Sequence, residues 1–335
     1  MKNILLINFG GIGDEILFLS VVQTLKKDYP DSKITLCLEP RSRSITDLTS
    51  DIDEIITADI KKEGIGKYFE ILKMLTKIRK KKYDVVISSG KSPVVAILEF
   101  LTGIKKRIGF KSKTSFLLTD SVQLNENQYA SYMYHDLLKP ISNKTPELPK
   151  IELKDEELSN YLLKDFLGKE YIALHPGVSE MSIRKGIYKS LSGNDWCELV
   201  LGILKKGKRV ILLGGRDDKK IIDEIISNEE ITSNSNFLNL AMKTKNLIEL
   251  ACLIQKSSTF ICADSAPLHV AVGLNKRVLA FFGPTNEEKL LPKKDNFIAM
   301  TSKTACRPCL WHKRQRNCEN SDCLKIEINE FLSKI

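Results

Sequence analysis

The sequence predicts an α/β protein made of two Rossmann-like halves, each with a doubly wound parallel sheet. Short runs rich in Ile, Leu and Val alternate with helical patterns along the chain, and glycine-containing turns follow several of these runs. Alternation of this kind implies right-handed crossovers and parallel strands. The chain has 335 residues, of which 42% are hydrophobic, so it is long enough to bury the cores of two domains.

The first half comprises residues 1–150. Its apolar runs have the length of buried strands, and the patterns between them repeat with helical periodicity. Residues 139–150 are polar and punctuated by proline, so we expect them to form the linker to the second half. Strands are predicted at residues 4–8, 34–38, 54–57 and 85–88, and helices at residues 15–26, 66–79 and 93–101.

The second half, residues 151–335, repeats this alternation. Its apolar runs are again typical of buried strands in a parallel sheet. No repeat of short period and no low-complexity tract interrupts it. Strands are predicted at residues 171–174, 210–213, 259–262 and 278–282, and helices at residues 195–206, 217–226 and 246–254.

The chain has a net charge of +10, and two of its basic stretches contain no acidic residue. Such stretches are either solvated surface or sites of attraction to a polyanion, for example a phosphorylated lipid headgroup, an anionic membrane or nucleic acid. Nucleic acid is disfavoured, because only 7% of residues are aromatic and no recognition helix or aromatic platform lies beside the basic residues. The stretches contain Lys105, Lys106, Arg107, Lys111 and Lys113, and Lys303, Arg307, Lys313, Arg314 and Arg316.

No segment predicts export or a membrane span. The longest apolar candidate, residues 94–104, is short for a transmembrane helix and is interrupted by Glu99. Residues 1–8 carry one positive charge and no cleavage site, so they read as the first strand. We therefore expect a cytoplasmic protein.

A glycine turn follows the first predicted strand and contains Gly10, Gly11, Gly13 and Asp14. The dinucleotide-binding pattern G-x-G-x-x-G fails here, because Ile16 occupies the place of its last glycine, and the chain contains no P-loop pattern. A nicotinamide enzyme and a P-loop kinase are therefore disfavoured. The turn allows a close approach of backbone to a ligand. Asp14 is either a cap of the following helix or a group that takes part in chemistry.

Four strand ends of the second half carry loops typical of a nucleotide site. Parallel strands place such loops at one edge of the sheet, where glycines and helix N-termini present N–H groups to phosphate. Arg184 or Lys185 is expected to supply positive charge, and Asp217 or Asp218 to accept hydrogen bonds from a ribose. His175 and His269 are interpreted as organisers of their loops. The loops contain His175, Pro176 and Gly177; Gly214, Gly215 and Asp218; Asp264, Ser265, Ala266, Pro267 and His269; and Gly283 and Thr285.

Four cysteines lie close together in the C-terminal segment 303–325: Cys306, Cys309, Cys318 and Cys323. A C-x-x-C pair with two further cysteines nearby can surround one tetrahedral Zn or Fe ion. Disulfides and free thiols are the alternatives, the former disfavoured in the cytoplasm. A metal here would have a structural role, and no catalytic metal is expected. The other four cysteines lie in apolar runs and are interpreted as small buried hydrophobes.

Taken together, these motifs resemble the ADP-heptose:lipopolysaccharide heptosyltransferase family, glycosyltransferase family 9, over nearly the whole chain. The resemblance implies a GT-B architecture in which two Rossmann-like domains face each other across a cleft. Residues 1–150 would bind the acceptor and residues 151–335 the ADP-sugar. In the family the aspartate of the first glycine turn is taken as the catalytic base of an inverting transfer, and it corresponds to Asp14. Four-cysteine C-terminal segments occur in part of the family, including relatives that heptosylate proteins.

The chain departs from the family pattern at two places. The usual Lys-Trp-Pro run after the His-Pro-Gly loop is replaced by residues 182–188, so the resemblance leaves the phosphate-binding cation open between Arg184 and Lys185. The ribose-binding acid is commonly Glu, and here it is Asp218.

The resemblance implies a heptosyltransferase that uses ADP-heptose and an acceptor hydroxyl on the lipopolysaccharide inner core. An anionic glycolipid acceptor agrees with the net charge of +10, and peripheral contact with the inner membrane is expected. Protein O-heptosylation is the alternative within the family. A binding protein for nucleotide sugars or nucleic acid, without turnover, is the alternative from a different class.

Overall fold

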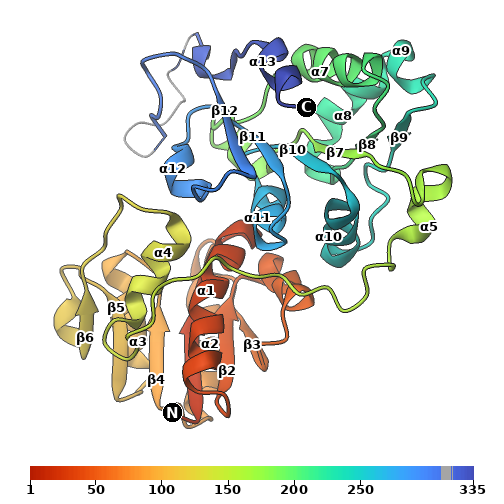
Figure 1. Cartoon of the computed structure of the whole chain (residues 1–335). Coiled ribbons are helices and arrows are strands. Elements are labelled where there is room, and N and C mark those ends of the chain that lie inside the picture. The colour runs from red at the N-terminus through yellow and green to blue at the C-terminus, as the bar shows by residue number, and fades with distance from the viewer. Residues whose placement is uncertain (311–317, 319) are drawn as a thin grey trace. The chain divides into compact units, whose positions relative to one another are not determined.

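The computed structural model describes residues 1–310, 318 and 320–335. The chain divides into two compact units, Met1–Glu152 and Leu153–Ile335. Each unit contains a six-stranded sheet in which all strands are parallel, with helices packed on both faces (Figure 1). The predicted class of two Rossmann-like α/β domains is therefore confirmed.

In the first unit the strands lie in the order β3-β2-β1-β4-β5-β6. Strand β1 is central, because it pairs with β2 on one side and with β4 on the other. The chain thus leaves β1 at the point where the strand order reverses, which is where open parallel sheets bind ligands. The strands are β1 (Asn3–Ile7), β2 (Lys33–Leu38), β3 (Glu54–Thr57), β4 (Val85–Ser88), β5 (Lys106–Phe110) and β6 (Asp120–Val122).

Alternate residues of these strands point to opposite faces of the sheet. Leu5 and Ile7 of β1 pack against Met74 and Ile78 of α2 and Leu98 of α3, so α2 and α3 share one face. The other face is covered by α1, which packs against α4. The helices of the first unit are α1 (Ile12–Asp28), η1 (Pro40–Leu48), α2 (Ile65–Arg79), α3 (Pro93–Leu101), η2 (Ser115–Leu117), α4 (Ala130–His135) and η3 (Asp136–Leu138).

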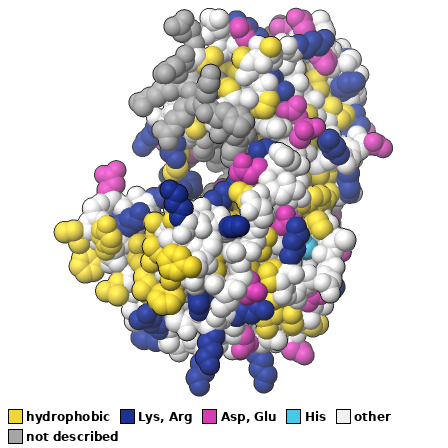
Figure 2. Space-filling model, turned by 90° about the vertical axis from the view of Figure 1, so that its left-hand side faces the viewer, with side chains coloured by type: hydrophobic (Ala, Val, Ile, Leu, Met, Phe, Trp, Pro, Cys, Tyr) yellow, Lys and Arg dark blue, Asp and Glu magenta, His cyan; other side chains and the backbone are white. Residues whose placement is uncertain are grey.

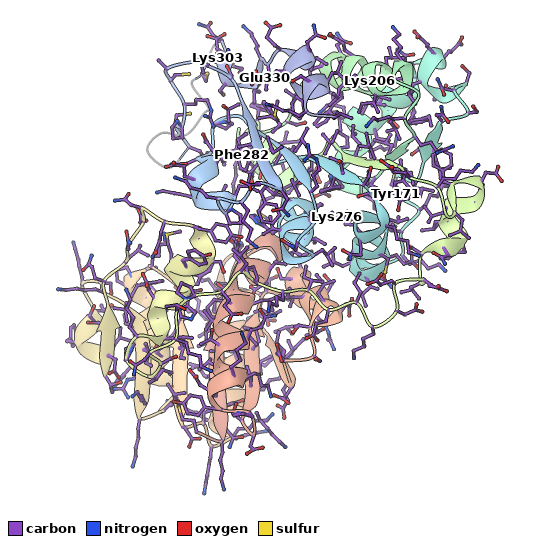
Figure 3. The ribbon with its side chains drawn as sticks, viewed as in Figure 1. Tyr171, Lys206, Lys276, Phe282, Lys303 and Glu330 are labelled. Carbon is purple, nitrogen blue, oxygen red and sulfur yellow. The ribbon has the colours of Figure 1, made fainter. Side chains whose placement is uncertain are left out.

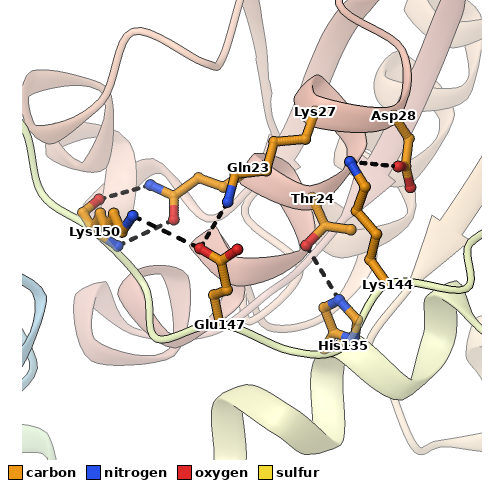
Figure 4. A network of polar contacts seen from close by, with 8 residues as sticks. All are labelled: Gln23, Thr24, Lys27, Asp28, His135, Lys144, Glu147 and Lys150. Atoms are coloured by element: carbon orange, nitrogen blue, oxygen red, sulfur yellow. Dashed lines mark hydrogen bonds and ion pairs between the residues drawn. The ribbon is translucent and has the colours of Figure 1, made fainter.

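The segment predicted to be a linker, residues 139–150, is bound to α1 along its length (Figure 4). The side-chain amide of Gln23 donates to the carbonyl of Lys150 at 2.7 Å and accepts from its N–H at 3.0 Å. Lys144 forms an ion pair with Asp28 at 2.9 Å. The sequence did not predict these contacts, because proline spacing and polarity do not reveal partners that lie on a distant helix.

The second unit repeats the topology with the order β12-β11-β10-β7-β8-β9. Strand β7 is central here, pairing with β10 and β8. The carboxyl ends of β7, β8, β10 and β11 therefore lie side by side at one edge of the sheet, which we call the carboxyl edge. The strands are β7 (Ile172–His175), β8 (Val210–Leu212), β9 (Phe237–Asn239), β10 (Thr259–Ala263), β11 (Val278–Phe282) and β12 (Phe297–Thr301).

Hydrogen bonds fix the outer helices of this unit to its core (Figure 3). The hydroxyl of Tyr171, just before β7, donates to the carbonyl of Leu253 in α10 at 2.8 Å. Lys206 donates to the carbonyl of Leu332 in the last helix. The helices are α5 (Asn160–Leu163), η4 (Lys164–Phe166), α6 (Glu180–Arg184), α7 (Gly193–Lys205), η5 (Arg216–Asp218), α8 (Lys219–Ile226), α9 (Glu229–Thr232), α10 (Leu247–Lys256), α11 (Ala266–Gly273), α12 (Glu287–Leu290), η7 (Asp322–Leu324) and α13 (Ile328–Ser333).

The eight strands predicted from the sequence are confirmed, and β5, β6, β9 and β12 were not predicted. Strand β5 begins with Lys106 and Arg107, which are only partly buried, so its sequence resembles a basic loop more than a buried strand. Strands β6 and β9 have three residues each, too few to establish a period of two.

One carboxyl group is buried in the first unit without a compensating partner. Glu99 of α3 is 0% exposed, and neither of its carboxyl oxygens has a hydrogen-bond partner in the described part of the chain. Burial raises the pKa of Glu99 to about 9, although the charge of Arg107 acts in the opposite direction. Glu99 is therefore protonated in the folded protein at neutral pH.

This state predicts a specific dependence of stability on pH. Between the ordinary pKa of Glu, near 4.5, and the folded value of about 9, the unfolded chain releases the proton and the folded chain keeps it. The free energy of unfolding of the wild type should therefore fall, relative to that of Glu99→Gln, by up to about 4 kcal/mol between about pH 5 and pH 8. Urea unfolding at both pH values measures this difference. Glu63→Gln, at an exposed position, is the control, and a difference that does not change with pH would contradict the assignment.

Candidate functional site

The glycine turn of the first unit connects β1 to α1. Gly11 is the N-cap of α1, and its N–H donates to Oδ2 of Asp14 at 2.9 Å. A Cβ atom at Gly10 would lie 2.2 Å from the Cβ of Asp14, so the turn has no room for a side chain there. Asp14 is exposed, and its second oxygen, Oδ1, accepts the hydroxyl of Tyr134 at 3.5 Å. Asp14 is thus a helix cap whose carboxylate is also accessible.

Two titratable groups beside Asp14 were not predicted from the sequence. Glu15 is buried, and one of its oxygens accepts the N–H of Gly10 at 3.3 Å. Burial raises the pKa of Glu15 to about 8, and the charge of Asp14 adds to the shift. Burial and the same charge raise the pKa of Tyr134 well above its ordinary value. Near neutral pH both groups keep their protons, which leaves Asp14 as the negative charge of the turn.

Two cations lie at the carboxyl edge of the first sheet, close to this turn. Both bind the buried carboxylate of Glu39, which follows β2: Arg41 at 2.6 Å and Lys61 at 2.7 Å. The guanidinium of Arg41 also lies 3.8 Å from where a Cβ of Gly11 would be. The sequence gives little indication of this cluster, because its three members are spread over two loops.

In the second unit, Asp218 joins two of the predicted loops. Its Oδ2 accepts the N–H of Gly215 at 2.7 Å and lies 3.4 Å from Nε2 of His175. A Cβ at Gly177 would lie 1.8 Å from Asp218 Oδ1, so Gly177 makes the space that Asp218 fills. Asp218 is 7% exposed, and its carboxylate contacts Gly215 and His175 of the two loops. The exposed acid at this place is Asp217.

The expected cations Arg184 and Lys185 lie on or just after α6 and are exposed. Arg184 forms an ion pair with Glu180, one turn earlier, at 2.6 Å. The cation that the structure brings to the strand ends is Lys189, whose ammonium lies 3.1 Å from the buried carboxylate of Asp264. Lys189 was not predicted, because the unusual sequence after the His-Pro-Gly loop does not show which of its basic residues reaches the strand ends.

The loop after β10 leads directly into α11. Ser265 is the N-cap, yet its side chain makes no cap hydrogen bond, and Pro267 lies in the first turn. No side-chain cap from Ser265 therefore competes with an anion for the N–H groups at the start of this helix. His269 is buried within α11. After β11, the hydroxyl of Thr285 is buried and has no hydrogen-bond partner among the residues described.

Arg307, which lies between Cys306 and Cys309, holds the loop after β11. Its guanidinium donates to the carbonyls of Gly283 at 3.0 Å and Thr285 at 3.1 Å. It also forms an ion pair with Glu287 at 2.7 Å and is only 9% exposed. The cysteine-containing segment is therefore connected to one of the four loops by a buried, charge-assisted contact.

None of the four clustered cysteines forms a disulfide in the described part of the chain. Burial raises the pKa of Cys323 to about 11, and the other three thiols add to this shift, so all three lie within electrostatic range of Cys323. In the described part of the chain, no three His, Cys, Asp or Glu side chains are close enough to hold a metal ion. Residues 311–317 and 319 lie outside the described residues. The basic residues Lys313, Arg314 and Arg316 fall among them.

Comparison with known proteins identifies a family that matches most of the chain. The family model described as Glycosyltransferase family 9 (heptosyltransferase) matches residues 71–319. Lipopolysaccharide heptosyltransferase 3 of Escherichia coli is 25% identical over 303 residues, which cover 85% of this chain and 85% of that protein.

Solved structures share the fold. The E. coli ADP-heptose lps heptosyltransferase II has a TM-score of 0.73 at 21% identity, covering 99% of this chain and 98% of that one. The dodecameric iron-containing heptosyltransferase TibC from E. coli, in complex with ADP-D-beta-D-heptose, has a TM-score of 0.61 at 11% identity, covering 99% and 75%. The predicted GT-B fold is confirmed.

The geometry of the glycine turn predicts losses of stability of different size at two adjacent positions. Gly10→Ala should lower the free energy of unfolding by about 1–3 kcal/mol, because the added methyl group overlaps Asp14. Gly11→Ala should cost about 0.5 kcal/mol, because Ala is a poorer N-cap than Gly but the nearest neighbours of its methyl group would be 3.8 Å away. Urea unfolding of the two variants measures the difference. Equal losses would show that the turn is not packed as described.

Proposed function

The chain belongs to glycosyltransferase family 9, the heptosyltransferases, and from this membership we propose that it transfers heptose from ADP-heptose to an acceptor hydroxyl with inversion. It is a glycosyltransferase. The observation that carries the proposed mechanism is the Asp14 carboxylate, anchored by Gly11 through one oxygen and exposed to an incoming hydroxyl.

In the proposed reaction Asp14 acts as the general base. It takes the proton of the acceptor hydroxyl while that oxygen forms a bond to the anomeric carbon. The bond from this carbon to the phosphate oxygen breaks, and ADP leaves with the electron pair on the opposite side, which inverts the configuration. The neutral state of Glu15 and Tyr134 supports this role, because Asp14 does not share its charge with a second ionised group.

We infer that the ADP moiety binds at the carboxyl edge of the second sheet. The departing diphosphate gains negative charge and requires cations and N–H donors that are already in place. The start of α11, the buried hydroxyl of Thr285 and the ammonium of Lys189 are such groups. Asp217 is the acid available to a ribose diol, since Asp218 is occupied.

The acceptor we propose is a sugar of the lipopolysaccharide inner core, which the names of the relatives suggest. Such glycolipids carry phosphate or carboxylate groups, and Arg41 and Lys61 beside the glycine turn offer positive charge to them. A protein hydroxyl is the alternative acceptor. ADP release measured with each acceptor type, and with a panel of nucleotide sugars, separates the two.

The central test is Asp14→Asn. The amide oxygen of Asn can still accept the N–H of Gly11, so the cap is retained, but Asn cannot take a proton. We expect transfer to fall by at least about 100-fold, while calorimetry finds ADP affinity unchanged. Asp195→Asn is the matched control, because Asp195 has the same capping-box position at α7. Full activity of Asp14→Asn would remove Asp14 from the mechanism.

We also propose that Cys306, Cys309, Cys318 and Cys323 bind one structural Zn or Fe ion. The donor set fits, since the other three thiols lie within electrostatic range of Cys323 and thiolates are preferred ligands of both metals. The thiols would have to move closer together on binding, because the described ones do not form a preformed site. When bound, the metal would stabilise the tail, and Arg307 would transmit that stability to the Gly283–Thr285 loop.

Metal analysis of purified protein tests this proposal directly. Elemental analysis should find one ion per chain, and substitution of the four cysteines by serine should abolish it. A control with Cys197→Ser and Cys252→Ser, which lie in α7 and α10, should retain the metal. Retention of metal by the first variant would place the ion elsewhere.

A further inference from the structure

One segment of the first unit, residues 61–117, combines an unusual charge with unusual apolar exposure. It contains fifteen Lys and Arg and four Asp and Glu, a net charge of +11, whereas the whole chain has +10. It also holds nine of the fifteen large hydrophobic side chains that are exposed among the described residues. These nine are Ile65, Tyr68, Phe69, Leu72, Val94, Ile97, Phe100, Leu101 and Phe116.

The apolar residues of α2 form a stripe along one side of the helix. Ile65, Tyr68, Phe69 and Leu72 follow the i, i+3, i+4, i+7 spacing of a single helix face, and each is more than 60% exposed. The core-facing side of α2 is formed by other residues, such as Met74 and Ile78. Helix α2 therefore has an apolar face for its own core and a second one that no described residue covers.

The exposed residues of α3 and η2 continue this surface. Phe116 of η2 is 81% exposed, and the neighbouring Thr114 donates a hydrogen bond to the carbonyl of Pro93 at the start of α3. Arg79 at the end of α2 donates to the carbonyl of Leu101 at the end of α3 at 2.9 Å. Hydrogen bonds thus join α3 to both of the other elements.

Basic residues surround these side chains. Lys67 and Lys73 lie on α2, and Lys111 and Lys113 precede η2; all four are exposed, and none forms an ion pair within the described part of the chain. The guanidinium of Arg107 lies 5.6 Å from the ring centre of Phe100. On the first unit, Figure 2 shows apolar side chains gathered in patches with Lys and Arg beside them.

We propose that this surface, the exposed side chains of residues 61–117, docks onto a membrane that contains anionic phospholipids. Aromatic and aliphatic side chains would enter the boundary between headgroups and acyl chains, and the lysines would contact lipid phosphates. Described helices lack the length and apolarity needed to span a membrane, so binding through this surface would be peripheral. The net charge of the segment favours an anionic bilayer over an apolar protein partner.

The position of the surface is compatible with catalysis on a glycolipid. Helices α2 and α3 follow the carboxyl ends of β3 and β4, the same edge of the first sheet at which β1 leads into Asp14. The most exposed large hydrophobic residue of α2, Ile65, lies at that end of the helix. This inference therefore deepens the proposed function, but membrane binding can be measured without any transfer reaction.

The test is co-sedimentation of the full chain with vesicles of phosphatidylcholine, with and without phosphatidylglycerol, at rising NaCl concentration. The wild type should bind only the anionic vesicles, and binding should weaken with salt. Lys73→Glu, Lys111→Glu and Lys113→Glu combined should lower the affinity at least about tenfold, as should Tyr68→Ser, Phe69→Ser and Phe116→Ser combined. Matched controls at exposed positions of the second unit are Lys169→Glu, Lys220→Glu and Lys243→Glu, and Leu158→Ser, Leu167→Ser and Met242→Ser.

Three results would overturn the proposal. The first is that the wild type does not bind anionic vesicles at low salt. The second is that the surface and control variants lose vesicle affinity equally. The third is that the wild type forms a dimer in sedimentation velocity and the triple serine variant of the surface does not. Unchanged circular dichroism and ADP affinity would show that a variant is folded. Failure of the glycosyltransfer proposal would leave the vesicle result unaffected, so the two are separable.

Discussion

A carboxylate that binds the backbone N–H of a glycine turn is the interaction on which the candidate site of each unit depends. Asp14 accepts the N–H of Gly11 at 2.9 Å, and Asp218 accepts that of Gly215 at 2.7 Å. In each case the acid lies three residues after the glycine, in the first turn of a helix, where its charge also complements the helix dipole. This contact fixes where the chain leaves a strand of the sheet, β1 in the first unit and β8 in the second. Loops that must meet a ligand at a sheet edge need such fixation, because a glycine turn is otherwise free to move.

The same contact explains what sequence reasoning could and could not resolve. The alternation of apolar runs and helical patterns was sufficient to predict two parallel sheets, because buried strands leave a continuous hydrophobic pattern. Asp14 and Asp218, however, occupy equivalent places in similar glycine turns, and the sequence does not distinguish them. Their burial differs because Gly177, from another loop, gives Asp218 a space to fill, whereas Asp14 remains exposed. Such differences arise from contacts between distant segments. For the same reason the sequence did not predict the roles of Glu39 and Lys189.

The C-terminal tail shows how a segment with little core of its own becomes part of a site. Arg307 reaches two carbonyls of the Gly283–Thr285 loop while its charge is balanced by Glu287. A buried guanidinium with a bidentate partner is costly to displace, so the loop and the tail should be ordered together. Any ligand of the clustered thiols that orders the tail would therefore also order this loop. The sequence suggested two independent features, a phosphate loop and a cysteine cluster, where the fold has one connected structure.

The net positive charge of the chain is concentrated in one segment of the first unit. Residues 61–117 have a net charge of +11, so the rest of the chain is close to neutral in net charge. The basic character noted in the sequence is therefore not a general property of the surface. Lys61 opens this segment and also binds Glu39 beside the glycine turn, so the charged surface begins at the carboxyl edge of the first sheet. The lipid-linked anionic acceptor proposed above would meet positive charge both at the exposed surface of residues 61–117 and at this edge.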